Sequence, residues 1–212
     1  MAKIIPHSPK TLRRNKVSVI IPARNEEEYI ERCIKSIQNQ DFGNYEIIVV
    51  DNGSTDNTKL IAESLGAKVV FESIAGLPRA RETGRKEAQG EYLVYLDADM
   101  VIPRNYLSKI VAGFDKHSEI SAISNPFSFY DGGFIIYLMG TIFFNIYAVF
   151  RSMNLLKGVF GGSFAVRRDV IEEIGGFDSN IEFYGEDTNI SKRILEKGKI
   201  AYIYNLYTNY IQ

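Results

Sequence analysis

The segment that decides the fold runs from Glu91 to Met100 and reads EYLVYLDADM. Residues 92–96 are all apolar or aromatic, which is typical of a strand buried on both faces. Asp97 and Asp99 follow at once. Because burying an unpartnered carboxylate is costly, we predict that the strand ends before them and delivers both side chains to a polar edge of a sheet.

Two earlier apolar runs end in the same way. VSVII, residues 17–21, leads into PARNE, and YEIIVV, residues 45–50, leads into DNGSTD. The runs alternate with helical stretches, which predicts an α/β fold with a mostly parallel sheet flanked by helices on both faces. Ligands of such sheets bind outside the carboxyl ends of the strands, where all three polar segments fall. The other predicted elements of the first hundred residues are helices at 26–40, 58–65 and 78–88 and a strand at 67–71.

Length and charge limit the organisation of the chain and its partners. Its 212 residues, 45% hydrophobic, suffice for one large domain, which we place at 17–212 with halves at 17–100 and 101–212. A net charge of -1 gives no reason to expect nucleic acid as a partner. Residues 1–16 belong to a basic stretch without acidic side chains. Such an arm is typical of a solvated terminus or of attachment to an anionic membrane surface.

Several common kinds of site lack the residues that they need. No G-x-G-x-x-G follows the first strand and no P-loop motif occurs, and one Cys with two His at unrelated positions cannot form an ordinary zinc site. GGSFA, residues 161–165, resembles a nucleophile elbow, but no histidine follows it to complete a triad. Cys33 is the only cysteine, and no secretory pattern opens the chain, so we expect a reducing, cytoplasmic location.

What remains is carboxylate chemistry at the predicted edge of the sheet. A lone D-x-D pair can simply cap a loop or a helix. Asp97 and Asp99, however, follow a buried strand, and their hard oxygen ligands suit Mg²⁺ or Mn²⁺ bound together with a diphosphate. Asp51 and Asp56 close the second run similarly, with Gly53 between them to admit a ligand close to the backbone. For this second segment the alternative is a turn followed by a helix cap.

Six segments in order resemble those of the family 2 nucleotide-sugar glycosyltransferases of GT-A fold, and they cover about residues 17 to 200. The resemblance implies an inverting transfer of a sugar from a nucleotide-diphosphate sugar, assisted by Mg²⁺ or Mn²⁺. It also implies a nucleotide-binding half at 17–100 and a mixed-sheet acceptor half at 101–212. The segments are VSVIIPARNEEEYIERCIKSIQNQ, YEIIVVDNGSTDNT, GLPRARETG, EYLVYLDADM, GGSFAVRRDVIEEIGGFD and FYGEDTNISKRILEKG.

The same resemblance implies roles on the donor side. Asp99 would bind the metal, and Asp97 would reach the ribose or the metal's water. The block around Arg81 carries Glu82 where the family usually has Asn, which leaves the contact of that block open. The residues implied to bind the donor nucleotide are Pro22, Ala23, Arg24, Glu26, Asp51, Gly53, Arg81 and Asp97.

On the acceptor side, Asp187 in GED matches the family's catalytic base, with Glu186 and Gly162 near the acceptor. Displacement at an anomeric carbon needs a stabilised diphosphate and a carboxylate that deprotonates the acceptor hydroxyl, and Asp99 and Asp187 suit these two tasks. Taken alone, the same segment reads as a helix start with acidic residues at its positive end. An acceptor that is already an anionic phosphate would need no base.

Residues 132–150, GGFIIYLMGTIFFNIYAVF, hold 19 residues without a charge, a length within transmembrane range. A spanning helix would separate Asp99 from Asp187 across the bilayer. We therefore expect a helix that is either buried or lies on the membrane surface. The second alternative would suit a lipid-linked acceptor and a peripheral location on the cytoplasmic membrane face, whereas the first leaves a glycan acceptor equally open.

Other functions use part of this residue set. A sugar nucleotidyltransferase shares a related sheet with metal and carboxylates but releases pyrophosphate. A glycoside hydrolase has no use for a metal-diphosphate site. A non-catalytic nucleotide-sugar-binding module is a further alternative, against which the retained DAD and GED segments argue. Among donors, Asp51 favours UDP because a carboxylate can accept from the N3 proton of uracil, and guanine and thymine nucleotides remain open.

Overall fold

The computed structural model of the protein describes residues 16–129, 139, 142, 162–181, 185–206 and 208–210. Within these residues a seven-stranded sheet has the order β3-β2-β1-β4-β8-β6-β9, and a three-stranded sheet has the order β5-β10-β7. The strands are β1 (Val17–Ala23), β2 (Tyr45–Asp51), β3 (Lys68–Phe71), β4 (Tyr92–Leu96), β5 (Met100–Val101), β6 (Ile120–Ser124), β7 (Phe127–Phe129), β8 (Ser163–Arg167), β9 (Lys199–Tyr202) and β10 (Thr208–Tyr210). The helices are α1 (Ile30–Gln38), α2 (Thr58–Ser64), α3 (Leu77–Glu87), α4 (Tyr106–Lys116), α6 (Arg168–Glu173) and α7 (Glu186–Leu195).

The first four strands of the large sheet are parallel, and the second half is mixed. β1 pairs in parallel with β2 and β4, and β2 with β3. β8 runs antiparallel to both β4 and β6. The predicted α/β fold with a mostly parallel sheet and a mixed second half is therefore confirmed.

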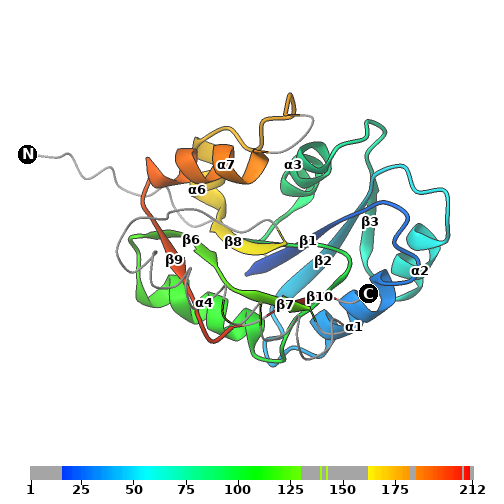
Figure 1. Ribbon diagram of the computed structural model, residues 1–212, viewed down its shortest axis with the longest axis horizontal. Helices are drawn as coiled ribbons and strands as arrows, with labels where there is room; N and C mark the ends of the chain where they lie inside the picture. The colour runs from blue at the N-terminus through cyan, green and yellow to red at the C-terminus, as the bar shows by residue number, and fades with distance from the viewer. Residues whose placement is uncertain are drawn as a thin grey trace, which may run out of the picture.

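Helices cover both faces of the large sheet, as Figure 1 shows with α3, α6 and α7 above it and α1 and α4 below. Two clusters of buried apolar side chains result. One joins α1 and α4 to the sheet, and the other joins α3, α6 and α7 to the opposite face. Every residue of β1 and β4 is buried because helices cover both faces of the sheet, and all of these residues except Ser18 are apolar or aromatic.

The first helix begins later than the sequence predicts, at Ile30 rather than at residue 26. Asn25 has a φ of 56°, and the Glu26 carbonyl accepts hydrogen bonds from the backbone amides of Tyr29 and Ile30. The backbone amide of Glu26 donates a hydrogen bond to the Thr58 hydroxyl at 2.7 Å. Tertiary bonds to the second loop thus hold the start of the segment out of the helix and leave Glu26 at the edge of the sheet.

The small sheet was not predicted from the sequence. β5 and β10 have two and three residues, too few for a periodic pattern, and they pair only because the chain end returns to the DAD segment.

Two predictions fall largely outside the described residues. These are the basic arm, of which only Lys16 is described, and the stretch 132–150, of which Met139 and Ile142 are described with exposed side chains. Among the described residues there is no helix with the length and apolar character needed to cross a bilayer.

Candidate active site

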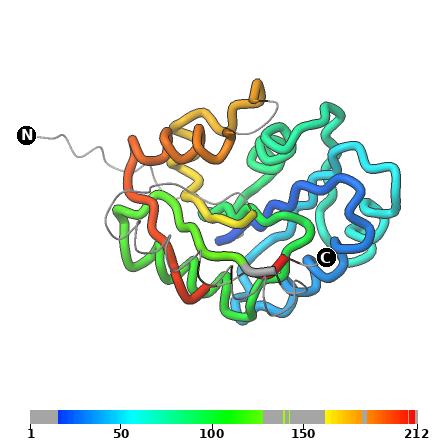
Figure 2. The backbone as a smooth tube through the Cα atoms, viewed as in Figure 1, coloured from blue at the N-terminus to red at the C-terminus, as the bar shows by residue number. Residues whose placement is uncertain are grey.

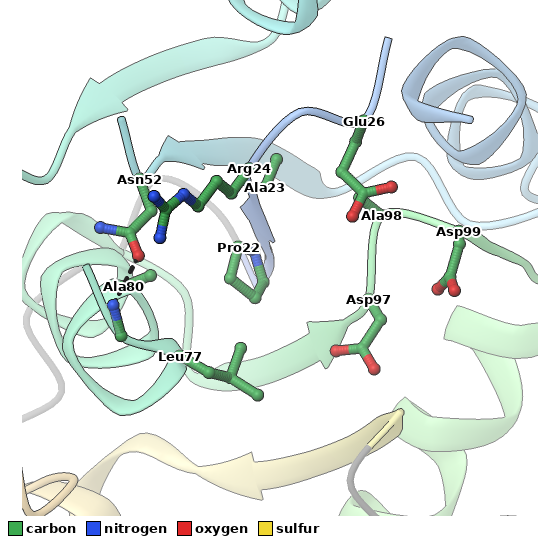
Figure 3. A pocket seen from close by; sticks show the side chains of 11 residues that line it. Pro22, Ala23, Arg24, Glu26, Asn52, Leu77, Ala80, Asp97, Ala98 and Asp99 are labelled. Carbon is green, nitrogen blue, oxygen red and sulfur yellow. Dashed lines mark hydrogen bonds between the residues drawn. The ribbon is translucent and has the colours of Figure 1, made fainter. Parts of the chain in front are cut away.

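A pocket of about 340 Å³ opens at the carboxyl ends of β1, β2 and β4 (Figure 3), and its size is typical of small-molecule sites. The three polar segments that follow these strands in the sequence therefore meet, as the parallel topology predicts. The lining residues are Pro22, Ala23, Arg24, Glu26, Asn52, Gly76, Leu77, Ala80, Asp97, Ala98 and Asp99.

The pocket has two chemically different ends. In Figure 3 the carboxyl groups of Glu26, Asp97 and Asp99 gather on one side, and Arg24 and Asn52 lie on the other. An acidic end suits a cation with its phosphate ligands, and a neutral to basic end suits a nucleoside or an anionic group.

Asn52 was missed by the sequence analysis, although it adjoins Asp51 in the DNGSTD segment. Its side-chain amide donates to the carbonyls of Glu72 (3.0 Å) and Ile74 (2.8 Å), and its oxygen accepts from the amide of Gly76 at 2.8 Å. These bonds fasten the loop that enters α3, so that Gly76 and Leu77 reach the wall of the pocket.

Asp51 and Gly53 shape the second loop and do not line the pocket. Asp51 is 4% exposed, and its Oδ1 accepts a hydrogen bond from the amide of Ser54 at 3.0 Å. Gly53 has a φ of 76°, which glycine adopts without strain. Asp56 accepts bonds from the amides of Thr58 and Glu27. The turn predicted as an alternative for this segment is present.

The carboxyl groups at the acidic end hold their protons more tightly than usual. Burial, with the charges of Asp99 and Asp56, raises the pKa of Glu26 to about 7. Burial also raises the pKa of Asp97 to about 7, with Arg81 opposing the rise and Asp99 adding to it. The pKa of Asp99 is raised by burial as well. A bound cation would relieve this crowding of negative charge.

The described residues contain no group of three His, Cys, Asp or Glu side chains close enough to hold a metal by themselves. One or two carboxylates with water and phosphate oxygens are, however, the usual protein share of a magnesium site. Asp97 and Asp99 fit that pattern, because both face the pocket in which a diphosphate could complete the coordination.

Arg81 joins the pocket to the GED segment. Its guanidinium is 1% exposed and lies 3.5 Å from Asp97 Oδ1, 3.6 Å from Glu186 Oε1 and 3.3 Å from Asp187 Oδ1. Arg81, which was expected near the base or the diphosphate, lies among carboxylates from the end of β4 and the start of α7. Burial raises the pKa of Asp187, and the charge of Arg81 limits that rise.

Glu186 and Asp187 occupy the first turn of α7, after Gly185 with a φ of 99°. The helix start that the sequence also allowed is therefore present, and the same helix carries both carboxylates to Arg81. Asp187 remains 34% exposed, so its carboxylate is open to an incoming ligand.

Glu82 is the residue that departs from the family pattern, and its hydrogen bonds are made outside the pocket. Its carboxylate accepts from Arg85 at 2.7 and 2.8 Å and from the amide of Phe177 at 3.1 Å. It therefore ties α3 to the segment between α6 and α7.

Gly162 and Tyr210 lie beside Asp97. The carbonyl of Gly162 accepts a hydrogen bond from the Asp97 amide at 3.0 Å, and the Tyr210 hydroxyl lies 3.5 Å from Asp97 Oδ2. Burial raises the pKa of Tyr210, so the phenol keeps its proton and donates. No local pattern in the sequence singled out Tyr210.

A comparison with protein families now decides the membership of the chain. The sequence profile of the family described as "Glycosyl transferase family 2" matches residues 18–175, well over half of the chain. The chain belongs to glycosyl transferase family 2. The matched range contains the whole pocket and ends before Asp187 and Tyr210.

Curated relatives and solved structures agree with this family. The chain is 32% identical over 200 residues to a dolichol-phosphate mannosyltransferase of Pyrococcus furiosus, covering 88% of this chain and 54% of that protein. It is 29% identical to a cholesterol galactosyltransferase of Borreliella burgdorferi, covering 94% of this chain and 61% of that protein. The chain thus spans less than two thirds of either relative. A mannosyltransferase structure from Pyrobaculum calidifontis, in complex with GDP-Man and Mn²⁺, superposes with a TM-score of 0.76 at 24% identity, covering 98% of this chain and 60% of that one. This likeness confirms the GT-A fold.

Proposed function

We propose that this chain is an inverting glycosyltransferase that moves a sugar from a nucleotide-diphosphate sugar to a hydroxyl or lipid-phosphate acceptor, with Mg²⁺ or Mn²⁺ bound. The observation that carries the proposal is the position of Arg81, whose guanidinium lies within 3.5 Å of both Asp97 and Asp187. Arg81 thus holds the two carboxylates near each other, and a sugar bound beside this bridge would have a site for its leaving group at Asp97 and a base at Asp187.

On the donor side, Arg24 and its neighbours Pro22 and Ala23 would contact the nucleoside at the neutral end of the pocket, with Glu26 nearer the acidic end. A UDP-sugar is the first candidate by the resemblance to the family. Asp51 is nearly buried and lies outside the pocket lining, so its carboxylate would have to turn toward the pocket to accept from the N3 proton of uracil. The GDP-Man bound by the Pyrobaculum mannosyltransferase supports testing a guanine donor as well.

Asp99 and Asp97 would hold the divalent cation. Both are hard oxygen ligands that line the pocket, and a bound cation would offset the burial that raises their pKa values. The bound cation would offset the negative charge that develops on the departing diphosphate.

On the acceptor side, Asp187 would accept the proton of the attacking hydroxyl, with Glu186 and Gly162 nearby. The acceptor oxygen bonds to the anomeric carbon from the face opposite the diphosphate. The bond from that carbon to the diphosphate oxygen breaks, its electron pair leaves with the nucleoside diphosphate, and the configuration inverts. The two relatives named for dolichol phosphate and cholesterol support a lipid acceptor.

The test is to incubate the protein and Mn²⁺ with UDP-, GDP- and dTDP-sugars, with and without a polyprenyl phosphate, and to identify the products. We expect a nucleoside diphosphate and a glycosylated acceptor of inverted configuration. Release of pyrophosphate would instead identify a sugar nucleotidyltransferase. Tight donor binding without turnover on any acceptor would favour a non-catalytic binding module. Flotation with anionic liposomes tests peripheral attachment to a membrane surface, which is rejected if the protein stays in the soluble fraction.

A further inference from the structure

The end of the described chain returns to the DAD segment, as the trace in Figure 2 shows for the red C-terminal part. β10 pairs antiparallel with β5, so that Tyr210 stands opposite Met100 and Asn209 opposite Val101. Met100 directly follows Asp99 in the sequence. The backbone of β10 therefore braces the segment that carries both aspartates.

The side chain of Tyr210 completes the surroundings of Asp97. Its hydroxyl lies 3.5 Å from Asp97 Oδ2, while the Arg81 guanidinium lies 3.5 Å from the other oxygen, Oδ1. The Tyr210 ring packs edge to face on Phe127, with 5.0 Å between centroids. The Asp97 carboxylate is thus held from two sides, by the Arg81 guanidinium and by the Tyr210 hydroxyl.

Gly162 makes room for this contact. A Cβ atom at this position would collide with the Tyr210 hydroxyl and would lie 2.7 Å from the terminal methyl carbon of Met100. Any larger residue at position 162 would therefore have to displace the phenol from Asp97.

A buried polar network fixes β10 two residues before Tyr210. Thr208 is fully buried, its hydroxyl lies 3.0 Å from that of Ser163, and its amide donates to the Pro126 carbonyl at 3.1 Å. Asn125 donates to the Ser163 hydroxyl at 2.9 Å. Buried polar groups with satisfied bonds specify one arrangement, so the register of β10, and with it the place of Tyr210, is well determined.

We propose that Tyr210 is a positioning residue for the cation site, holding Asp97 in the orientation in which it and Asp99 bind a divalent ion. This inference rests on the proposed function. A carboxylate with one partner can rotate, whereas hydrogen bonds on both oxygens restrict its plane before the ion arrives. Removal of such an outer partner typically weakens metal binding by about 10- to 100-fold.

The test is the affinity for Mn²⁺, followed by electron paramagnetic resonance, in separate titrations at saturating UDP and at saturating GDP. Tyr210→Phe removes the hydroxyl and keeps the ring on Phe127. We expect its Kd for Mn²⁺ to rise about tenfold, while the metal-free melting temperature changes by less than about 2 °C. Tyr204→Phe is the matched control, because Tyr204 is 44% exposed in the same C-terminal part. Gly162→Ala, which displaces the phenol, should raise the Kd at least as much as Tyr210→Phe.

A Kd for Tyr210→Phe within twofold of the native value overturns the inference, and so does a fall in melting temperature without a change in Kd. If the native protein does not bind Mn²⁺ in the presence of UDP or in the presence of GDP, the metal-assisted function fails together with the inference. If the native protein binds Mn²⁺ and Tyr210→Phe binds it equally well, the inference alone fails.

Discussion

Arg81 and Asp187 form an ion pair of 3.3 Å across 106 residues of sequence, from the buried side of α3 to the first turn of α7. The same guanidinium is shared with Asp97 and Glu186. One positive charge thus serves three carboxylates, one at the end of β4 and two in the first turn of α7, and the balance of charge in the site depends on it.

Arg81→Gln should destabilise the protein by about 3–5 kcal/mol, because it leaves partly buried carboxylates without their cation. Urea unfolding at pH 7 measures the effect. Lys86→Gln removes a positive charge from an exposed position of the same helix and should change stability by less than about 0.5 kcal/mol. Equal, small effects of the two substitutions would show that the network does not support the fold.

Asp187→Asn should lower turnover by about 10²–10⁴-fold with a hydroxyl acceptor, since asparagine cannot accept the proton. Metal-dependent binding of the donor nucleotide should remain close to native, because Asp187 does not line the pocket. Product assays and calorimetry separate the two quantities. Glu173→Gln changes an exposed carboxylate on α6 and serves as the control. Unchanged turnover with a hydroxyl acceptor would remove Asp187 as the base.

Glu26→Gln should make the metal-free protein more stable relative to native as the pH rises. The folded-state pKa of Glu26 is raised from 4.5 to about 7, so the native fold binds this proton more tightly than the unfolded chain does. Native stability therefore falls between pH 4.5 and pH 7, whereas glutamine does not titrate. After allowance for solvent screening, we expect a relative gain of about 1 kcal/mol between pH 4 and pH 8 in urea unfolding.

The control is Glu28→Gln, which removes the charge of an exposed carboxylate in the same segment and leaves Glu26 in place. A Glu26→Gln protein whose stability relative to native falls as the pH rises from 4 to 8 would contradict the assigned environment of Glu26.

Gly84→Ala tests the close contact of α3 with the sheet. An added Cβ would collide with the Ile20 side chain and lie 3.1 Å from a methyl group of Val50. We expect a loss of about 1–3 kcal/mol from overpacking, although alanine is the better helix former. Gly43→Ala adds a Cβ with no atom within 4 Å and should be nearly neutral. A more stable Gly84→Ala protein would mean that helix propensity outweighs packing at this position.

The sequence predicted the sheet edge well because the relevant signals are local. Predominantly apolar runs mark β1 and β4. The polar residues after each run, including Asp97 and Asp99, reach the pocket because parallel strands end at one edge. The predicted start of α1 was wrong, because the hydrogen bond from the Glu26 amide to Thr58 joins distant parts of the chain and is not visible in the local sequence.

The rest of the site depends on contacts between distant parts of the chain. The partners of Arg81 lie up to 106 residues away, and Tyr210 reaches Asp97 across 113 residues. When the role of a side chain depends only on a contact with a distant part of the chain, the local sequence shows no periodicity or composition that would reveal it. Asn52 is the intermediate case, because its position beside Asp51 was visible while its bonds to the loop before α3 were not.

The central claim, a metal-dependent site for a nucleotide-diphosphate sugar at the end of β4, is tested most directly by isothermal titration calorimetry. UDP-, GDP- and dTDP-sugars are titrated with and without Mn²⁺ into the native protein and into Asp99→Asn. We expect one nucleotide class to bind the native protein in the presence of Mn²⁺, and this binding to weaken at least tenfold without the ion or in Asp99→Asn. Binding of no nucleotide sugar by the native protein, or equal binding with and without Mn²⁺, would contradict the claim.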